Sequence, residues 1–297
     1  MDPVITVVNR IQKFIEEHLD EKITLLMLSR IANYSPWYVD KIFKKYLNKT
    51  PMQYIQERRL TKAALKLMHN QPKIIDVALE FLFDSHEGFT GAFTKQFGIS
   101  PYRYKIDSPA ISLFLPYPLF DYNQYMKERG IKMSVKPVPI FTQVIERPER
   151  KLILKRGEKA SHYFAYCEEV GCDIWGILTS IKEALYEPVG MWLPKSLRNG
   201  QSEYVQGVEV SMDFSKSIPE GFEIITLKPQ LYMIFQGPRY EDESFMEAID
   251  EFNRAVESFD PTLYGYEYDY DNAPKFQLEP RGERGYIEAK PIRKISV

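Results

Sequence analysis

One short segment of this 297-residue chain combines an indole, a carboxylate and three ammonium groups at helical spacing. The segment begins at Ser35-Pro36, a helix N-cap followed by proline at the first helical position. The residues outside its apolar stripe are Trp37, Asp40, Lys41, Lys44 and Lys45. Three lysines alone are typical of a solvated helix face, but an exposed indole beside them favours contact with nucleic acid. We therefore take this segment as a candidate DNA-reading helix.

Length and composition set limits on the rest of the chain. With 44% hydrophobic residues and a mean hydropathy of −0.35, the chain is typical of a globular protein, and its length predicts two domains. No run approaches the roughly 20 apolar residues of a membrane span, and the first ten residues lack the pattern of a signal peptide. We therefore expect a cytoplasmic protein with no membrane partner.

The sequence lacks the common metal, disulfide and catalytic motifs. Cys167 and Cys172 cannot form a disulfide framework, and four scattered histidines give no zinc-ligand spacing. The GxSxG, HExxH, P-loop and CxxC patterns do not occur. We expect no metal, no cofactor and no catalytic activity, and we expect both cysteines to occupy small buried positions.

Charge divides the chain near Asp107. Residues 1–107 carry 16 lysines and arginines against 12 acidic residues, whereas the remainder carries 23 against 29. The first part thus has a net charge of +4 and the second a net charge of −6. This asymmetry favours nucleic acid as the partner of the first part and a cationic or aromatic partner for the second, although two solvated surfaces give the same numbers.

The candidate reading helix lies within a series of predicted helices. Apolar residues recur at steps of three and four over 4–18, which predicts a helix there. Thr24 is the predicted N-cap of a helix over 25–32, and Asn33 suits the tight turn that follows. Two short helices joined by such a turn form a helix-turn-helix.

The same pattern occurs again after a long helix. Thr50-Pro51 begins a predicted helix that runs to about His69, and 70–72 ends it. A helix over 74–81 and a turn over 82–84 follow. Ser85 then caps a helix that ends at Phe97 and Gly98. The sequence thus predicts two helix-turn-helix units.

Residues 1–105 resemble the DNA-binding domain of the AraC/XylS family, which has two helix-turn-helix units bridged by a linker helix. The matching segments are Leu28–Ser35 into Phe43-Lys44, Pro51–Ile55 with Arg59-Leu60 and Ala63, Ile75–Ala78 with Phe83, and Phe93 and Phe97–Pro101 with Tyr104. The family lays its reading helices into successive major-groove segments about 34 Å apart. The resemblance implies base-facing positions at Trp37, Asp40, Lys41, His86, Glu87, Gly88 and Gly91. We add Lys44, Lys45 and Lys95 to the candidate DNA contacts.

The chain departs from the family pattern in its second unit. Leu82 stands where the family usually has glycine, and a bulky residue in a left-handed turn costs about 1 kcal/mol or more. Gly88 and Gly91 lower the helix propensity, and Gly91 has no side chain to read a base. We therefore expect the first unit to dominate sequence reading.

Residues 108–131 are the predicted linker between domains over 1–107 and 132–297. The segment contains Pro109, Pro116 and Pro118 among apolar residues and is too apolar for a flexible linker, so we expect it to pack on a domain. Whether it orients the two domains or joins a dimer contact stays open. A short helix fits 122–129.

Residues 132–297 predict an α+β domain in which one strand, one helix and two strands occur twice. The first copy has a strand over 151–155, a helix over 163–185, and strands over 189–193 and 204–212. The second copy has a strand over 230–235, a helix over 243–259, and strands over 263–270 and 285–295. The predicted fold class is an all-α double helix-turn-helix domain followed by this duplicated α+β domain.

This second half resembles the GyrI-like effector-binding domain. The matching segments are Lys136–Pro139 leading into Arg150–Leu152, Met233–Pro238 before a helix, and Ile287–Ile292 at the close. The resemblance implies a ring-lined cleft for lipophilic cations or other small aromatics, commonly with one buried carboxylate from a strand. Some GyrI-like proteins instead hydrolyse small electrophiles, which leaves an enzyme as an alternative.

The predicted effector site combines a carboxylate with aromatic rings. Glu288 is the first candidate because it shares strand parity with Tyr286 and lies in the strand that the family uses, and Glu209 in the matching strand is the second. A cation entering an apolar cleft loses hydration, and each ring in its place contributes about 0.5–2 kcal/mol. The candidate rings are Tyr163, Phe164, Trp175, Trp192, Tyr264, Tyr266, Tyr268 and Tyr286. Tyr264, Tyr266, Tyr268 and Tyr270 are expected to point one way.

These features predict a bacterial-type transcription regulator. Its expected partners are double-stranded promoter DNA, RNA polymerase and a small cationic or aromatic effector, as in multidrug sensing. Two alternatives stay open: an enzyme that turns over a small molecule in the second domain, and a ligand-blind constitutive activator.

Overall fold

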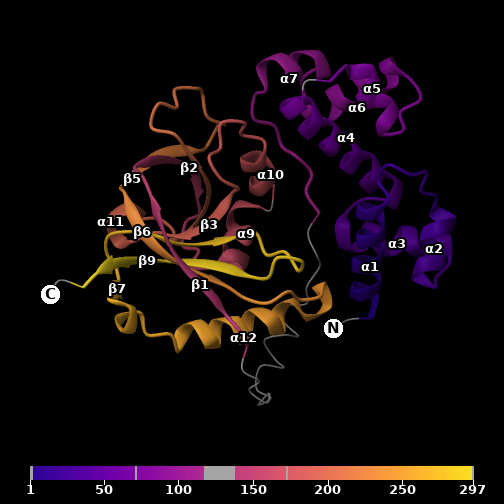
Figure 1. Cartoon of the computed structure of the whole chain (residues 1–297). Coiled ribbons are helices and arrows are strands. Elements are labelled where there is room, and N and C mark those ends of the chain that lie inside the picture. The colour runs from indigo at the N-terminus through magenta and orange to yellow at the C-terminus, as the bar shows by residue number, and fades with distance from the viewer. Residues whose placement is uncertain (1–2, 71, 117–137, 172, 296–297) are drawn as a thin grey trace. The chain divides into compact units, whose positions relative to one another are not determined.

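The computed structural model describes residues 3–70, 72–116, 138–171 and 173–295 (Figure 1). The chain divides into two compact units, Met1–Lys132 and Met133–Val297. The described part of the first unit is helical, and the second unit is built on an antiparallel sheet. No helix in these ranges is long and apolar enough to cross a membrane. The helix suggested for 122–129, Lys136-Pro137 and Cys172 lie outside the described residues.

The helices of the first unit begin where the sequence signals predict. They are α1 (Pro3–Glu17), α2 (Leu25–Ala32), α3 (Pro36–Leu47), α4 (Pro51–Asn70), α5 (Ile74–Glu80), α6 (His86–Phe97) and α7 (Pro101–Asp107). The side chains of Thr24 and Ser35 each accept a backbone hydrogen bond at 3.3 Å, and that of Ser85 accepts one at 3.0 Å. These three predicted N-caps are confirmed, and they fix the starts of α2, α3 and α6.

The long helix α4 joins two separate apolar cores. Tyr54 and Ile55 belong to the core formed with α1, α2 and α3. Leu60 and Leu67 belong to the core formed with α5, α6 and α7. Near the middle of α4, the buried Arg58 donates two hydrogen bonds of 2.7 Å to the Glu16 carboxylate of α1. The two helix-turn-helix units therefore share one rigid bridge.

The segment after α7 packs on the first unit, as its apolar composition predicted. Ile111 and Leu113 are buried in the core around the second half of α4. The backbone N–H of Phe114 donates to Thr61 Oγ1 at 3.1 Å, and its ring meets that of Tyr54 at a centroid distance of 5.2 Å. The described part of the predicted linker, through residue 116, is thus a fixed part of this unit.

The strands of the second unit form one sheet in the order β1-β6-β9-β8-β3-β4-β2-β5, and β7 also pairs with β9. They are β1 (Phe141–Arg147), β2 (Arg150–Arg156), β3 (Val189–Trp192), β4 (Tyr204–Val210), β5 (Glu223–Leu227), β6 (Gln230–Gln236), β7 (Tyr266–Tyr268), β8 (Lys275–Leu278) and β9 (Ile287–Lys294). All of these pairings are antiparallel.

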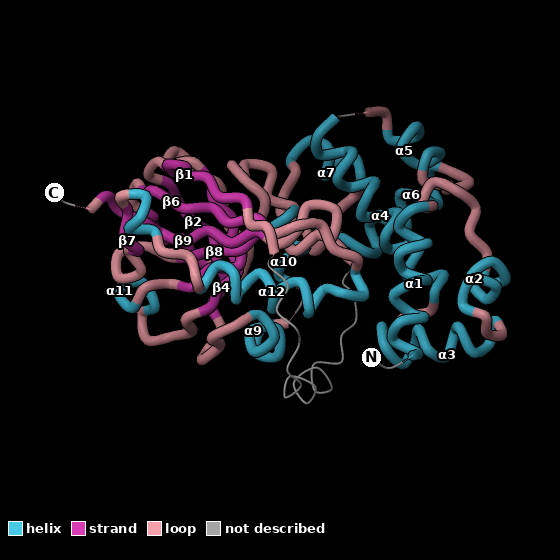
Figure 2. The backbone as a smooth tube through the Cα atoms, turned by 60° about the horizontal axis from the view of Figure 1, so that its bottom comes forward, coloured by secondary structure: helices cyan, strands magenta, loops and turns pink. Residues whose placement is uncertain are grey.

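Helices cover one face of this sheet. These helices are α9 (Tyr163–Val170), α10 (Ile174–Thr179) and α12 (Phe245–Glu257), whereas Leu197 of the short α11 (Lys195–Arg198) packs with the core on the opposite face. The 3-10 helices are η1 (Asp242–Ser244) and η2 (Pro261–Tyr264). Helix α10 packs on Val208, and α12 packs on Phe235. The row of opposed residues across β6, β9, β8, β3 and β4 is Phe235, Glu288, Gln277, Gly190 and Gln206. Because opposed residues share a face, α10 and α12 lie on the same side, where α9 also lies (Figure 2).

Several predicted elements differ from the observed ones. The single helix expected over 163–185 is two helices, since α9 ends at Val170 and Gly171 follows in a non-helical conformation. The strand expected over 263–270 is only β7, because η2 and the left-handed Gly265 precede it. The strands β1, β5 and β8 were not predicted. The sheet-plus-helix class is as expected.

Candidate nucleic-acid interface and effector site

Helix α3 presents an indole and several charged groups on its exposed side. Trp37 is 70% exposed, and Lys41 Nζ lies 5.2 Å from the centre of its ring. Lys44 Nζ pairs with Asp40 Oδ2 one turn earlier, at 2.7 Å. Lys45 is also exposed, whereas the opposite side of the helix is buried in the first core. This face therefore offers ammonium groups for phosphates and an indole for base edges.

Helix α6 presents fewer large polar side chains on its exposed side than α3 does. His86, Glu87 and Lys95 are exposed, while Phe89 and Phe93 are buried. Gly88 and Gly91 are also exposed, and a Cβ added at Gly91 would meet no atom within 4 Å. The exposed side of α6 consequently has fewer long hydrogen-bonding side chains than that of α3.

The turn before α6 has the left-handed backbone conformation that the family resemblance implied. Leu82 has a φ of +59°, in the left-handed region, and its side chain is 43% exposed. The corresponding turn before α3 has Asn33 at φ +57°, a residue type that tolerates this conformation. The second turn therefore contains a steric strain that the first avoids.

Glu288 lies on the helix-covered face of β9 and is 6% exposed. Two ammonium groups face its carboxylate: Lys275 Nζ from β8 at 3.6 Å and Lys290 Nζ from β9 at 3.9 Å. On the same face, the buried Tyr286 donates its hydroxyl hydrogen to Gln277 Oε1. The structure thus brings together Glu288, Tyr286 and two lysines that sequence reasoning missed. The parity of Lys290, two residues after Glu288, was the available signal.

Aromatic rings lie beneath both lysines. Lys275 Nζ is 4.1 Å from the ring centre of Trp192, and Lys290 Nζ is 5.3 Å from that of Tyr268 and 5.6 Å from that of Phe235. Burial lowers the pKa of Lys290, and although Glu288 acts in the opposite direction, Lys275 adds to the lowering. Burial, together with the charge of Glu288, raises the pKa of Tyr268 to about 12.

Two of the predicted rings lie at the start of α9, just after a residue that is hydrogen-bonded to Trp192. The Trp192 indole N–H donates to the backbone oxygen of Ser161 at 2.9 Å, which fastens this end of α9 to the last residue of β3. Tyr163 and Phe164 follow directly, with their ring centres 5.4 Å apart. Tyr163 is partly exposed and Phe164 is half-buried. The contact with Trp192 is thus made by the backbone before these two rings.

Glu209 lies on the opposite face of the sheet. Its neighbours in β4, Val208 and Val210, pack on α10, so the Glu209 side chain points away from the helices. Arg150 Nε donates to one of its oxygens at 2.7 Å, and Arg147 pairs with the other. The residue of β4 in register with Glu288 is Gln206, as the row of opposed residues shows. The structure does not bring the two candidate carboxylates together.

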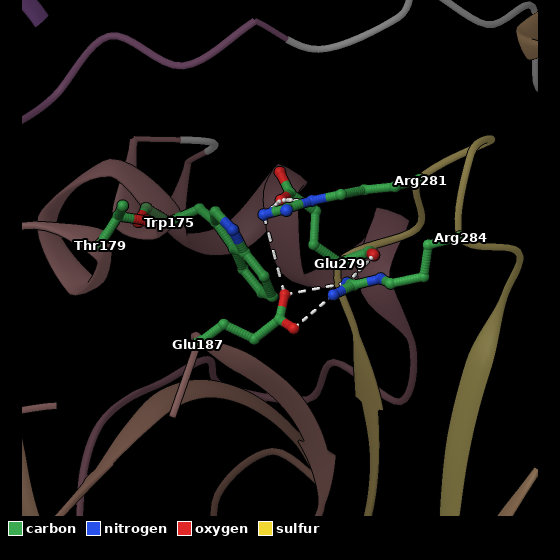
Figure 3. A network of polar contacts seen from close by, with 6 residues as sticks. All are labelled: Trp175, Thr179, Glu187, Glu279, Arg281 and Arg284. Carbon is green, nitrogen blue, oxygen red and sulfur yellow. Dashed lines mark hydrogen bonds and ion pairs between the residues drawn. The ribbon is translucent and has the colours of Figure 1, made fainter. Parts of the chain in front are cut away.

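Trp175 lies beside a different group of charges (Figure 3). Arg284 forms two hydrogen bonds to the Glu187 carboxylate, at 2.5 and 2.9 Å, and Arg281 pairs with Glu279 at 2.6 Å. These contacts join the turn between β8 and β9 to the segment before β3. Glu187 precedes Trp192 by five residues, about 17 Å along an extended chain, so the two indoles mark different regions.

The remaining predicted rings belong to the outer part of the sheet. Tyr264 is 63% exposed on η2 and stacks on Phe259 at 5.3 Å. Tyr266 is half-buried on β7 and packs with the core beneath α12. Because Tyr264 lies in a 3-10 helix, the expected common direction of Tyr264, Tyr266, Tyr268 and Tyr270 does not extend over all four residues.

The first unit has the architecture of a double helix-turn-helix protein, with α3 and α6 as second helices of the two units. Residues 28–106 match the family model described as a helix-turn-helix domain. The TetD protein of transposon Tn10 from Escherichia coli is 37% identical over 100 residues, 34% of this chain and 72% of that protein. The chain therefore belongs to the AraC/XylS family of DNA-binding transcription regulators.

Two further comparisons define how far this likeness extends. The transcriptional regulator Rob of Salmonella typhimurium is 38% identical over 95 residues, which is 32% of this chain and only about a third (33%) of Rob. A solved structure of SAV2435 bound to tetraphenylphosphonium matches with a TM-score of 0.34 and 17% identity, over 52% of this chain and 94% of that one. A likeness of that size identifies no effector for this chain.

Proposed function

We propose that this protein is a sequence-specific transcription regulator that reads promoter DNA with α3 and α6 and senses a small aromatic effector with its second unit. The observation that carries the DNA part is the exposed face of α3, where an indole and three lysines stand on a helix held by a buried core. We also propose that the regulator contacts RNA polymerase and acts in the cytoplasm.

The first reading helix is proposed to contribute most of the sequence discrimination. The ammonium group of Lys41 lies over the Trp37 ring, and this contact limits the side-chain conformations that DNA binding must fix. The ion pair with Lys44 neutralises Asp40, which would otherwise repel phosphates. In α6, Gly91 offers no side chain, and the strained Leu82 turn positions that helix.

We infer further that the second unit is a GyrI-like domain made of two copies of one strand-helix-strand-strand unit. The strand order supports this, because β2, β4 and β3 on one side of the sheet centre correspond to β6, β9 and β8 on the other. Helix α10 follows β2, and α12 follows β6. The proposed effector site lies where β3 and β8 meet, around Glu288 and Trp192.

Regulation, rather than turnover, is the activity that the relatives suggest. The Rob protein of Salmonella typhimurium is named a transcriptional regulator, and the helix-turn-helix family model covers 28–106. We propose no catalytic role for the cluster around Glu288, whose charged groups pair with one another.

The test is recovery of genomic DNA bound to the full-length protein, followed by affinity measurements on the recovered sequence and on a scrambled duplex. Trp37→Ala or Lys41→Ala should reduce the discrimination between the two duplexes by about 1–3 kcal/mol if either side chain reads a base. Gly91→Ala should leave it unchanged. Affinity for both duplexes should fall with rising salt, because phosphate contacts release counterions.

Lys62→Ala is the matched control, since Lys62 is exposed on α4 outside both reading helices. If His86→Ala and Glu87→Ala lose discrimination between the two duplexes and the Trp37 and Lys41 variants do not, α6 contributes most of the sequence discrimination instead. Failure of the folded protein to retain any duplex in a salt-dependent manner would refute the proposal as a whole.

A further inference from the structure

We propose that the effector of the second unit is an aromatic anion, recognised by Lys275, Lys290 and the phenol of Tyr268. This inference rests on the proposed effector function and assigns the charge of its ligand. It differs from the expectation for a lone carboxylate among rings, which is a preference for cations.

The charge at the centre of the cluster is positive. One carboxylate, that of Glu288, faces two ammonium groups, so the three side chains together carry a net charge of +1. The ammonium groups approach from both sides, at 3.6 Å from one carboxylate oxygen and 3.9 Å from the other. A cationic ligand would have to displace at least one of them, whereas an anion would complete their neutralisation.

Each ammonium group also occupies the position that a cationic ligand would take. Lys275 lies 4.1 Å above the ring centre of Trp192, and Lys290 lies 5.3 Å from the ring centre of Tyr268. The chain thus supplies its own cations to these rings. The remaining requirement of the cluster is negative charge, together with a flat apolar body that can pack against the ring edges.

Because the cluster is largely buried, leaving its net positive charge without a counter-charge is costly in free energy. The Lys290 side chain is 11% exposed and that of Glu288 is 7% exposed, while Lys275 is 30% exposed and keeps contact with solvent. Burial lowers the pKa of Lys290 in spite of the nearby Glu288, which agrees with an ammonium group that its surroundings do not fully neutralise. An anion arriving from solvent would therefore meet Lys275 first.

Tyr268 adds a neutral hydrogen-bond donor. Its hydroxyl oxygen is buried and has no hydrogen-bond partner among the described residues. Because burial and Glu288 raise its pKa to about 12, the phenol keeps its proton at neutral pH. A buried donor without an acceptor favours a ligand oxygen with negative charge.

Other carboxylates act on this cluster only from exposed positions. Glu257, at the end of α12, raises the pKa of Lys290, and Asp260 acts on Tyr268. Both are exposed, and the Asp260 carboxylate already accepts hydrogen bonds from Thr262. Solvent and salt screen their charges, so they do not reverse the sign at the buried centre.

The test compares two ligands with the same ring and opposite charge, naphthalene-2-sulfonate and 2-naphthyltrimethylammonium, by isothermal titration calorimetry of the full-length protein. We expect the sulfonate to bind at least about tenfold more tightly, which corresponds to one partly screened ion pair. Lys275→Met and Lys290→Met should each weaken sulfonate binding by about tenfold without weakening the ammonium ligand. Glu288→Gln should strengthen sulfonate binding.

Lys155→Met is the matched control, because Lys155 Nζ also lies over a ring, 5.6 Å from that of Phe222. Its strand β2 is three strands from β8, about 14 Å, so this variant should bind both ligands like the wild type. Tighter binding of the ammonium ligand by the wild-type protein overturns the anion preference but leaves an aromatic effector site. Absence of saturable binding for both ligands overturns the site and the anion preference together.

Discussion

Glu209 should be the most sensitive charged residue of the second unit. Its carboxylate is 1% exposed and lies between Arg147 and Arg150, whose side chains are 8% and 1% exposed. Burial by itself lowers the pKa of Arg150, and the charges and hydrogen bonds of Glu209 and Tyr232 more than offset this, so that its pKa is raised. Glu209→Gln keeps the shape of the side chain but removes the negative charge that compensates two buried guanidinium groups.

The size of the effect follows from this geometry. At an effective dielectric constant of about 20, two unit charges about 4 Å apart interact by about 4 kcal/mol, and Glu209 makes two such interactions. The loss is limited, because Arg150 keeps its hydrogen bonds to the backbone oxygens of Pro148 and Lys228. Removing one partner of a buried ion pair usually costs about 3–5 kcal/mol, and we expect Glu209→Gln to fall in that range.

The assay is urea denaturation of the full-length protein in a Trp37→Phe background, so that the fluorescence comes only from Trp175 and Trp192 of the second unit. Glu223→Gln is the control, because Glu223 pairs with Arg156 in the same sheet but is 42% exposed, and should cost at most about 1 kcal/mol. A loss of free energy of unfolding for Glu209→Gln no larger than that of this control, with an unchanged denaturant dependence, would refute the electrostatic reasoning.

Two further predictions concern the first unit. Leu82→Gly should raise the free energy of unfolding of the first unit by up to about 1 kcal/mol, because the left-handed φ of +59° strains leucine and the side chain is 43% exposed. An unchanged or lower melting temperature, measured by circular dichroism, would contradict this prediction. Burial raises the pKa of Tyr104 to about 12 from an ordinary value of 10.0, so its neutral form stabilises the fold fully below pH 10.0 and this contribution is lost as the pH rises toward 12. The free energy of unfolding should fall by about 2–3 kcal/mol at pH 12 because of Tyr104, and Tyr104→Phe should lack this contribution. If urea titrations show equal alkaline destabilisation of the wild type and Tyr104→Phe, Tyr104 is not its source.

Local sequence signals determined most of the first unit. The N-caps Thr24, Ser35 and Ser85 act within three residues of themselves, so their effect is visible without any tertiary contact. The apolar stripe of α3 likewise determined which side of that helix is exposed, and with it the position of Trp37. The left-handed turn at Leu82 was predicted from the resemblance to the AraC/XylS family, which usually has glycine there, and not from a local signal of this sequence.

The second unit depended far more on contacts between distant residues. The four residues of β8 form a strand because β3 and β9 lie on both sides of them, and nothing in so short a segment indicates this pairing. The break between α9 and α10 was hidden by a helical pattern of apolar residues that continues across it.

The candidate effector site shows the same division most clearly. The sequence by itself determined that Glu288 and Tyr286 share a face of one strand, because alternation along a strand is a local property. Only the tertiary structure decided that Glu209 points to the other face and is bound by Arg147 and Arg150. Only the register of β8 against β9 brought Lys275 to Glu288 and made the cluster positive, since the sign of a site is set by charges that are distant in sequence and close in space.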